Sequence, residues 1–212
     1  ELRGIRRDGA TLTIGAMARH AEVAASQEVM AAIPALARLA AGIGDRQVRN
    51  QGTLGGALAN NDPAADYPAA VLALGAVIHT NKRKIPADRF FKGLMETALK
   101  PGEIITEVAF PLSKRAAYIK FKNSASRYAL VGVFISETAD AVRVAVTGAA
   151  SSVFRVKPME KKLAEKFAPE AIAKVRVAPD KLNSDMHASA EYRSHLITVI
   201  AQRAVAAALA GK

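Results

Sequence analysis

Apolar and polar positions at the start of the chain alternate in short runs, which predicts short strands and short helices in turn. The segment from Leu2 to Ile14 has two apolar runs on either side of Asp8-Gly9, a dipeptide that favours the tight turn of a β-hairpin. Residues 16–30 and 35–43 follow with apolar side chains at helical spacing. Pro34 suits the first turn of the second of these helices.

The middle of the chain predicts a helix and two strands. Asp62-Pro63 supplies an N-cap and a first-turn proline for a helix over 64–74, and Gly75 suits its end. The other elements expected up to residue 110 are a strand over 76–80, a short helix near 88–91, a turn at Pro101-Gly102 and a strand over 103–110 with Ile104, Val108 and Phe110 on one face.

The second half of the chain predicts a sheet followed by helices. Strands are expected over 118–122, 130–138 and 142–147, and helices over 157–167 and 169–175. A final helix is the most regular element of the chain. Its apolar face repeats at i, i+3, i+4 spacing before Gly211, through Leu196, Val199, Ile200 and Ala204. The fold class is therefore α+β in two parts, 1–115 and 116–212, with the boundary near 111–115.

Composition narrows the chemistry. The 212 residues include no cysteine, so disulfides, thiolate zinc sites, a cysteine nucleophile and all-cysteine iron–sulfur clusters are excluded within this chain. No apolar run approaches the ~20 residues that a membrane-spanning helix needs, so we expect no membrane span. The net charge of +11 comes from scattered Lys and Arg residues, and aromatic residues are only 5%. This pattern gives little support to nucleic-acid binding and favours an anionic cofactor or an acidic partner.

Two kinds of candidate site remain. The four histidines (His20, His79, His187 and His195) show no metal-binding spacing, and we interpret them as surface or capping residues, with His187 and His195 on one helix. The glycine-dense segment 52–56 is a candidate for binding a phosphate, because glycine exposes backbone N–H groups and Thr53 adds a hydroxyl donor. Arg46 and Arg49 would suit an anion there. A plain loop between two helices is the equally open alternative.

Several short motifs, taken in order, resemble the FAD-binding subunits of molybdenum hydroxylases, a family that includes the carbon monoxide dehydrogenase medium subunit and the xanthine dehydrogenase flavin domain. They span most of the chain. The motifs are Gln47-Val48-Arg49-Asn50, Gly52-Thr53-Leu54-Gly55-Gly56, Asp62-Pro63-Ala64-Ala65-Asp66, Phe90-Phe91-Lys92-Gly93, Pro101-Gly102-Glu103-Ile104-Ile105, Lys120-Phe121-Lys122-Asn123, Ala125-Ser126-Arg127-Tyr128-Ala129, Thr147-Gly148-Ala149 and His187-Ala188-Ser189-Ala190-Glu191-Tyr192-Arg193.

The resemblance implies an architecture. Residues 1–115 would form the second subdomain of a PCMH/VAO-type FAD-binding domain, an antiparallel sheet with flanking helices. Residues 116–212 would form the carbon monoxide dehydrogenase flavoprotein C-terminal domain, a three-stranded antiparallel sheet with helices. The family's first FAD loop, an Ala-Gly-Gly segment of a preceding subdomain, has no counterpart in this sequence. We therefore expect the chain alone to bind FAD weakly or not at all.

The resemblance also implies site residues. Thr53, Gly55 and Gly56 would contact the pyrophosphate of FAD, and Ala57 departs from the asparagine common in the family. Lys122 would lie near the isoalloxazine, and Tyr128 is a candidate for stacking on the ring. The remaining expected contacts are Ile43 and Gly44 along the flavin site, Asn60 as a polar contact, Asp66 on the ribityl or adenosine side, and Ile104 and Ile105 near the adenine or the ring.

The implied function is that of an electron-transfer subunit. FAD would take electrons from [2Fe-2S] clusters in a small partner subunit, which receives them from molybdopterin in a large partner subunit, and pass them to an external acceptor. No catalytic residue or metal ligand is expected in this chain, and the cytoplasm is the expected location. The alternative is a non-catalytic scaffold that docks the partner subunits and retains no FAD.

Overall fold

The first half of the chain builds an antiparallel sheet covered by helices. The computed structural model describes residues 2–211. The sheet has the strand order β1-β2-β7-β3-β4, in which Leu12, Ile14, Ile78, Val108 and Phe110 are fully buried. Its strands are β1 (Ile5–Asp8), β2 (Thr11–Gly15), β7 (Ile105–Pro111), β3 (Val77–Thr80) and β4 (Lys84–Pro86), and a separate hairpin is made by β5 (Phe91–Gly93) and β6 (Glu96–Thr97).

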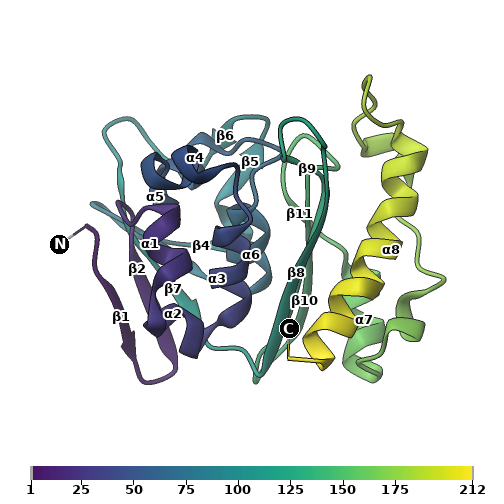
Figure 1. The fold of residues 1–212 in the computed structure, drawn as a ribbon, viewed down its shortest axis with the longest axis horizontal. Helices are drawn as coiled ribbons and strands as arrows, with labels where there is room; N and C mark the ends of the chain where they lie inside the picture. Colours follow the sequence, from purple (N-terminus) through teal and green to yellow (C-terminus); the bar gives the residue numbers. More distant parts are fainter. Residues whose placement is uncertain (1, 212) are drawn as a thin grey trace.

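Short helices lie against this sheet (Figure 1). They are α1 (His20–Ala25), α2 (Gln27–Ala32), α3 (Pro34–Ala41), α4 (Arg46–Gln51), α5 (Leu54–Asn60) and α6 (Tyr67–Ala73), with one 3₁₀ turn, η1 (Ala87–Arg89). Every residue of α6 is buried, so this helix is central to the molecule.

The second sheet lies between two layers of helices, α3 and α6 on one side and α7 and α8 on the other (Figure 1). Its order is β11-β10-β9-β8. Side chains on β9 alternate between the two sides: Phe134 joins the core of the first half, whereas Val133 and Ile135 face α8. The elements are β8 (Arg115–Lys122), β9 (Ala129–Glu137), β10 (Val142–Thr147), β11 (Phe154–Arg155), α7 (Lys157–Glu165), η2 (Pro169–Ile172), η3 (Pro179–Lys181) and α8 (Ala190–Leu209).

The α+β class and most predicted elements are confirmed, including the first hairpin, where Gly9 has φ +52°, and the final helix. The second sheet has the three predicted strands and adds β11 as a fourth, two residues long. The segment 169–175 was predicted as a helix and forms the 3₁₀ turn η2. His187 was expected on the final helix, but it lies before Ser189, which caps α8 by accepting the Tyr192 N–H.

Two helix predictions in the first half are wrong in extent. The single helix over 16–30 is divided into α1 and α2 at Ser26, which takes an extended conformation and whose hydroxyl accepts the Val29 N–H. The helix over 64–74 begins only at Tyr67, because the Asp62 carboxylate accepts the Ala64 N–H and holds a turn there. Such side-chain bonds to nearby backbone compete with helix formation. None of the helices within the described part of the chain is long and apolar enough to cross a membrane.

Candidate functional site

The glycine-dense segment 52–56 joins two short helices: it follows α4 and forms the first turn of α5. Asp45 caps α4 by accepting the Val48 N–H at 2.8 Å, and Thr53 caps α5 by accepting the Gly56 N–H at 3.1 Å. These side chains satisfy amide groups that a helix N-terminus otherwise leaves without partners. Gly55 and Gly56 therefore lie in the first turn of α5.

The expectation of bare backbone donors in this turn is wrong. Its N–H groups already bond within the chain, whereas the Thr53 hydroxyl, which accepts from Gly56, keeps a proton that it can donate to a ligand. The bonds are Leu54 N–H to the Ala18 carbonyl at 3.0 Å, Gly55 N–H to the Ala16 carbonyl at 2.8 Å and Ala57 N–H to the Thr53 carbonyl at 3.0 Å.

The two glycines of α5 differ in their surroundings. A Cβ on Gly55 would lie 2.6 Å from the Ala16 Cβ and 2.9 Å from the Ala16 carbonyl oxygen, so Gly55 allows α5 to pack against the chain that leaves β2. A Cβ on Gly56 would meet only the Thr53 hydroxyl, at 2.9 Å, and Gly56 is exposed. Gly56 is therefore the position at which a ligand can approach the backbone closely.

A cavity of about 150 Å³ lies beside this turn. It is bounded by α1, α4, α5, the start of α6 and the β8–β9 hairpin, and three of the predicted site residues line it. The lining consists of His20, Ile43, Val48, Ala57, Asn60, Asp62, Ala65, Asp66, Tyr67 and Tyr128. Gly44 adjoins it at φ +49°, and the carbonyls of Ile43 and Gly44 accept bonds from the Arg49 guanidinium at 2.9 and 3.1 Å.

Asp66 connects the two halves of the chain. It is 4% exposed, and its carboxylate accepts a hydrogen bond from the Tyr118 hydroxyl and pairs with the Lys120 ammonium at 3.0 Å. Lys120 also donates to the Gly42 carbonyl at 3.0 Å. Burial raises the pKa of the Asp66 carboxyl, against the opposing effects of Lys120 and Tyr118. Asp66 lines the cavity, but its oxygens are already bonded within the chain, so its first role is to hold β8 against α6.

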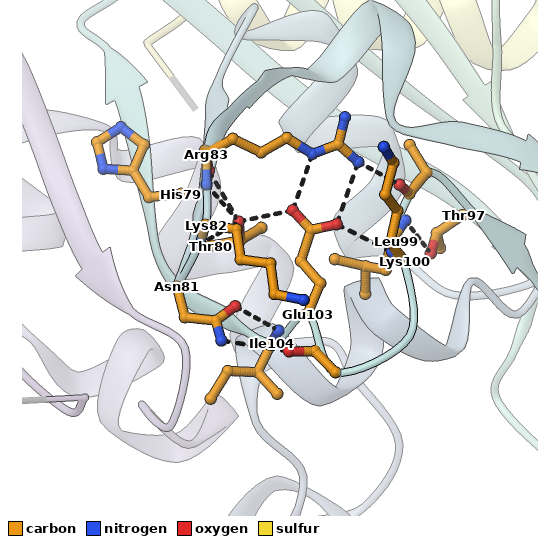
Figure 2. Close-up of polar contacts among 12 residues, drawn as sticks. His79, Thr80, Asn81, Lys82, Arg83, Thr97, Leu99, Lys100, Glu103 and Ile104 are labelled. Atoms are coloured by element: carbon orange, nitrogen blue, oxygen red, sulfur yellow. Dashed lines mark hydrogen bonds and ion pairs between the residues drawn. The ribbon is translucent and has the colours of Figure 1, made fainter.

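Ile104 and Ile105 do not line the cavity. The sequence predicted that Ile104 shares one face of a strand with Val108 and Phe110. This prediction is wrong, because Ile104 precedes β7 and is 56% exposed. Ile105 is buried. Figure 2 shows the polar cluster that fixes this turn: the Asn81 side chain accepts the Ile104 N–H at 3.0 Å.

Glu103 lies at the centre of that cluster (Figure 2). Its buried carboxylate accepts bonds from the Arg83 guanidinium at 2.9 and 3.1 Å, from the Lys100 N–H at 2.9 Å and from the Thr80 hydroxyl at 2.8 Å. The Arg83 bond first, then the Lys100 amide, lowers the pKa of Glu103 to about 2.

This shift predicts a pH dependence of folding. Because the pKa of Glu103 is lower in the folded chain than its ordinary value of 4.5, its stabilising effect is complete above that value and is lost as pH falls toward about 2. We expect Glu103→Gln to lower the free energy of unfolding at neutral pH, and the gap from wild type to narrow steadily as pH falls below 4.5. Urea unfolding of both proteins across this range measures the gap; a gap independent of pH would contradict the assignment.

Lys122 lies at the end of β8, on the hairpin that reaches the cavity through Tyr128. Lys122 is exposed and pairs in register with Ala129. The next residue, Asn123, donates its N–H to the Tyr128 carbonyl at 2.8 Å, and Tyr128 is 55% exposed at the cavity edge. The hairpin therefore brings the Tyr128 ring to the cavity edge and carries an exposed cation, Lys122, on the facing strand.

His20 and Tyr67 are among the cavity residues that the sequence did not indicate. His20 was interpreted as a surface or capping residue and is buried, and Tyr67 was not considered. The spacing of His20 and Val23, which share the buried side of α1, could have indicated the first. Tyr67 begins an unbroken run of buried residues in α6, directly after Asp66.

Comparison with known proteins identifies the family of this chain. Residues 1–113 match the model of the FAD binding domain in molybdopterin dehydrogenase, and residues 116–208 match that of the CO dehydrogenase flavoprotein C-terminal domain. The chain belongs to the family of FAD-binding medium subunits of molybdenum hydroxylases.

Individual relatives agree with this assignment. The carbon monoxide dehydrogenase medium chain of Hydrogenophaga pseudoflava is 34% identical over 99% of this chain and 79% of its own length. The nicotine 6-hydroxylase medium subunit of Paenarthrobacter nicotinovorans is 35% identical over 93% and 75%. Among solved structures, reconstituted CO dehydrogenase from Oligotropha carboxidovorans is similar with a TM-score of 0.88 and 28% identity, over 100% of this chain and 79% of that one. The relatives are subunits of oxidoreductases.

Proposed function

We propose that this chain carries FAD and serves as the electron-transfer subunit of a molybdenum hydroxylase in the cytoplasm. It would take electrons from the [2Fe-2S] clusters of a small partner subunit, which receives them from molybdopterin in a large partner subunit, and pass them to an external acceptor. The observation that carries the proposal is the cavity beside the exposed Gly56, lined by Ile43, Asn60 and Asp66, in a chain whose two halves match the flavoprotein family.

The residues present fit FAD. The Thr53 hydroxyl accepts from Gly56 and keeps its own proton to donate to the diphosphate, and Gly56 leaves room for the diphosphate to approach the backbone. His20 and Tyr67 line the cavity, and each keeps a buried polar atom (Nδ1 and Oη) with no partner among the described residues, as expected where a ligand completes the bonding. Bound FAD supplies the redox chemistry, and the chain positions it and sets its potential.

Lys122 would set that potential. A cation beside the flavin ring stabilises the negative charge that reduction places there. We expect Lys122→Met to lower the reduction potential of the bound flavin by about 30 mV, which is a tenfold change in equilibrium constant for a two-electron couple. Lys114→Met removes an equal charge from an exposed position in the β7–β8 connection and serves as the control. Equal potentials in the two variants, measured by redox titration, would contradict the placement of Lys122.

Electron transfer is tested by mixing. Oxidised, flavin-loaded protein from the complete gene is combined anaerobically with partner subunits that have been reduced with dithionite and desalted. The proposal expects loss of the visible flavin absorbance on mixing, and no loss when the partner clusters are oxidised. A flavin that stays oxidised beside reduced clusters contradicts the electron-transfer role and leaves FAD binding untouched.

A scaffold that docks the partners without FAD is the second candidate. It is supported by the first turn of α5, where the N–H groups of Leu54, Gly55, Gly56 and Ala57 are satisfied within the chain, and by the absence of a side-chain amide at Ala57. Flavin content separates the two candidates.

A further inference from the structure

The strongest unexplained feature of the molecule is a pair of unsatisfied polar atoms on two residues that line one cavity. Tyr67 is fully buried and His20 is 5% exposed. Neither Tyr67 Oη nor His20 Nδ1 has a hydrogen-bond partner among the described residues. The rings lie together, with centroids 5.2 Å apart and planes at 56°. A buried polar group without a partner is destabilising, so two such groups on the lining of one small cavity point to a ligand group that enters it.

The backbone around His20 holds the imidazole in this position. The His20 N–H donates to the Gly52 carbonyl at 3.0 Å, and a side chain at Gly52 would collide with the imidazole. Because Gly52 has no side chain, the imidazole can pack against its backbone, next to Thr53, the N-cap of α5. His20 therefore lies next to the turn at which we propose that the diphosphate binds.

The charges in the cavity select an uncharged ligand group. Burial, followed by the charge of Arg49, lowers the pKa of His20 to about 4, so the imidazole is neutral at physiological pH. Asp62 and Asp66 line the same cavity. A phosphate inside it would lie near two carboxylates, and the nearby cations are already engaged: Lys120 is paired with Asp66, and Arg49 donates to the Ile43 and Gly44 carbonyls. A hydroxyl or carbonyl group, by contrast, can bond to a tyrosine hydroxyl and a neutral imidazole without cost in charge.

We propose that His20 and Tyr67 are positioning residues that bind a hydroxyl or carbonyl group of the flavin half of FAD inside this cavity, while the diphosphate remains outside at Thr53 and Gly56. This inference rests on the proposed function. It assigns the cavity to the ribityl chain or the ring edge, and it excludes the adenosine half from it.

The test removes one atom. Tyr67→Phe keeps the ring and deletes only the hydroxyl that has no partner in the chain. We expect the ligand-free variant, made from the complete gene, to be as stable as wild type or more stable. Its affinity for FAD should fall about 10-fold, which corresponds to the loss of about one net hydrogen bond. Tyr118→Phe is the matched control, because its buried hydroxyl is bonded to Asp66; this variant should lose stability.

Competing ligands locate the group. FMN, lumiflavin and ADP are measured as competitors of FAD in wild type and in Tyr67→Phe. A lower affinity of Tyr67→Phe for FMN with an unchanged affinity for ADP supports the proposal. Lumiflavin has the ring without the ribityl chain, so its affinity also falls if the hydroxyl binds the ring and is unchanged if the hydroxyl binds the ribityl chain. Weakened ADP with unchanged FMN overturns it. Unchanged FAD affinity with a raised melting temperature also overturns it and indicates a buried water. In both cases a wild type that binds FAD leaves the proposed function standing, whereas a wild type that binds none contradicts the proposed function itself.

Discussion

Replacing Asp66 with alanine is expected to lower the free energy of unfolding by about 3–5 kcal/mol, the usual cost of removing one partner from a buried ion pair. The variant leaves the Lys120 side chain, 11% exposed, with only the Gly42 carbonyl, and it leaves the fully buried Tyr118 hydroxyl without its acceptor. Because these residues join β8 to α6, the contact between the two halves should weaken first. Chemical denaturation of wild type and variant measures the loss.

Asp88 provides the control for this prediction. It is a carboxylate with two arginine partners, Arg143 and Arg155, each at 3.0 Å, but its side chain is 42% exposed. Exposed pairs contribute about 0–1 kcal/mol, so Asp88→Ala should cost much less than Asp66→Ala. A loss for Asp66→Ala as small as the loss for Asp88→Ala would contradict the role of the Asp66 network.

Gly56→Val is expected to abolish FAD binding, with a loss of affinity of at least about 100-fold, or about 2.7 kcal/mol. The new side chain would stand at the exposed turn where the diphosphate approaches and would displace the Thr53 hydroxyl, which is 2.9 Å from the position of its Cβ. The fold should survive, because losing the Thr53 cap costs about 1 kcal/mol and valine is slightly better than glycine within a helix. Equilibrium titration with FAD, followed by flavin fluorescence, measures the loss.

Two other positions of α5 separate binding from folding. Ala59→Val places the same side chain at an exposed position of α5 outside the cavity lining, and it should retain FAD. Gly55→Val should fail to fold, because its Cβ would lie 2.6 Å from the Ala16 Cβ. If Gly56→Val binds FAD as tightly as Ala59→Val does, the diphosphate does not lie at this turn.

The sequence could predict elements whose signal is local. The Asp8-Gly9 hairpin and the apolar face of the last helix depend on residues a few positions apart, and both are confirmed. Helix boundaries were less predictable, because Ser26 and Asp62 bond to backbone N–H groups two or three residues away and divert the chain from helix. Periodicity does not record such bonds.

The candidate site was predictable only in part, for a different reason. Motifs led to Ile43, Asn60 and Asp66, which the fold brings to one cavity. They could not reveal that Tyr118 and Lys120, more than fifty residues away, already bind Asp66, or that Ala16 and Ala18 occupy the N–H groups of α5. These partners are distant in sequence and meet only through packing of the two halves. His20 differs from these residues: its spacing from Val23 on α1 is a local signal of burial, and packing against Tyr67 and Gly52 completes that burial.

Flavin content shows whether FAD is held at the turn of Thr53 and Gly56 in the protein made from the complete gene. The protein is purified from its complete gene, saturated with FAD and desalted, and released flavin is quantified against protein. We expect about one FAD per chain in wild type and in Ala59→Val, and almost none in Gly56→Val. A folded wild type without flavin would contradict this expectation and favour the scaffold.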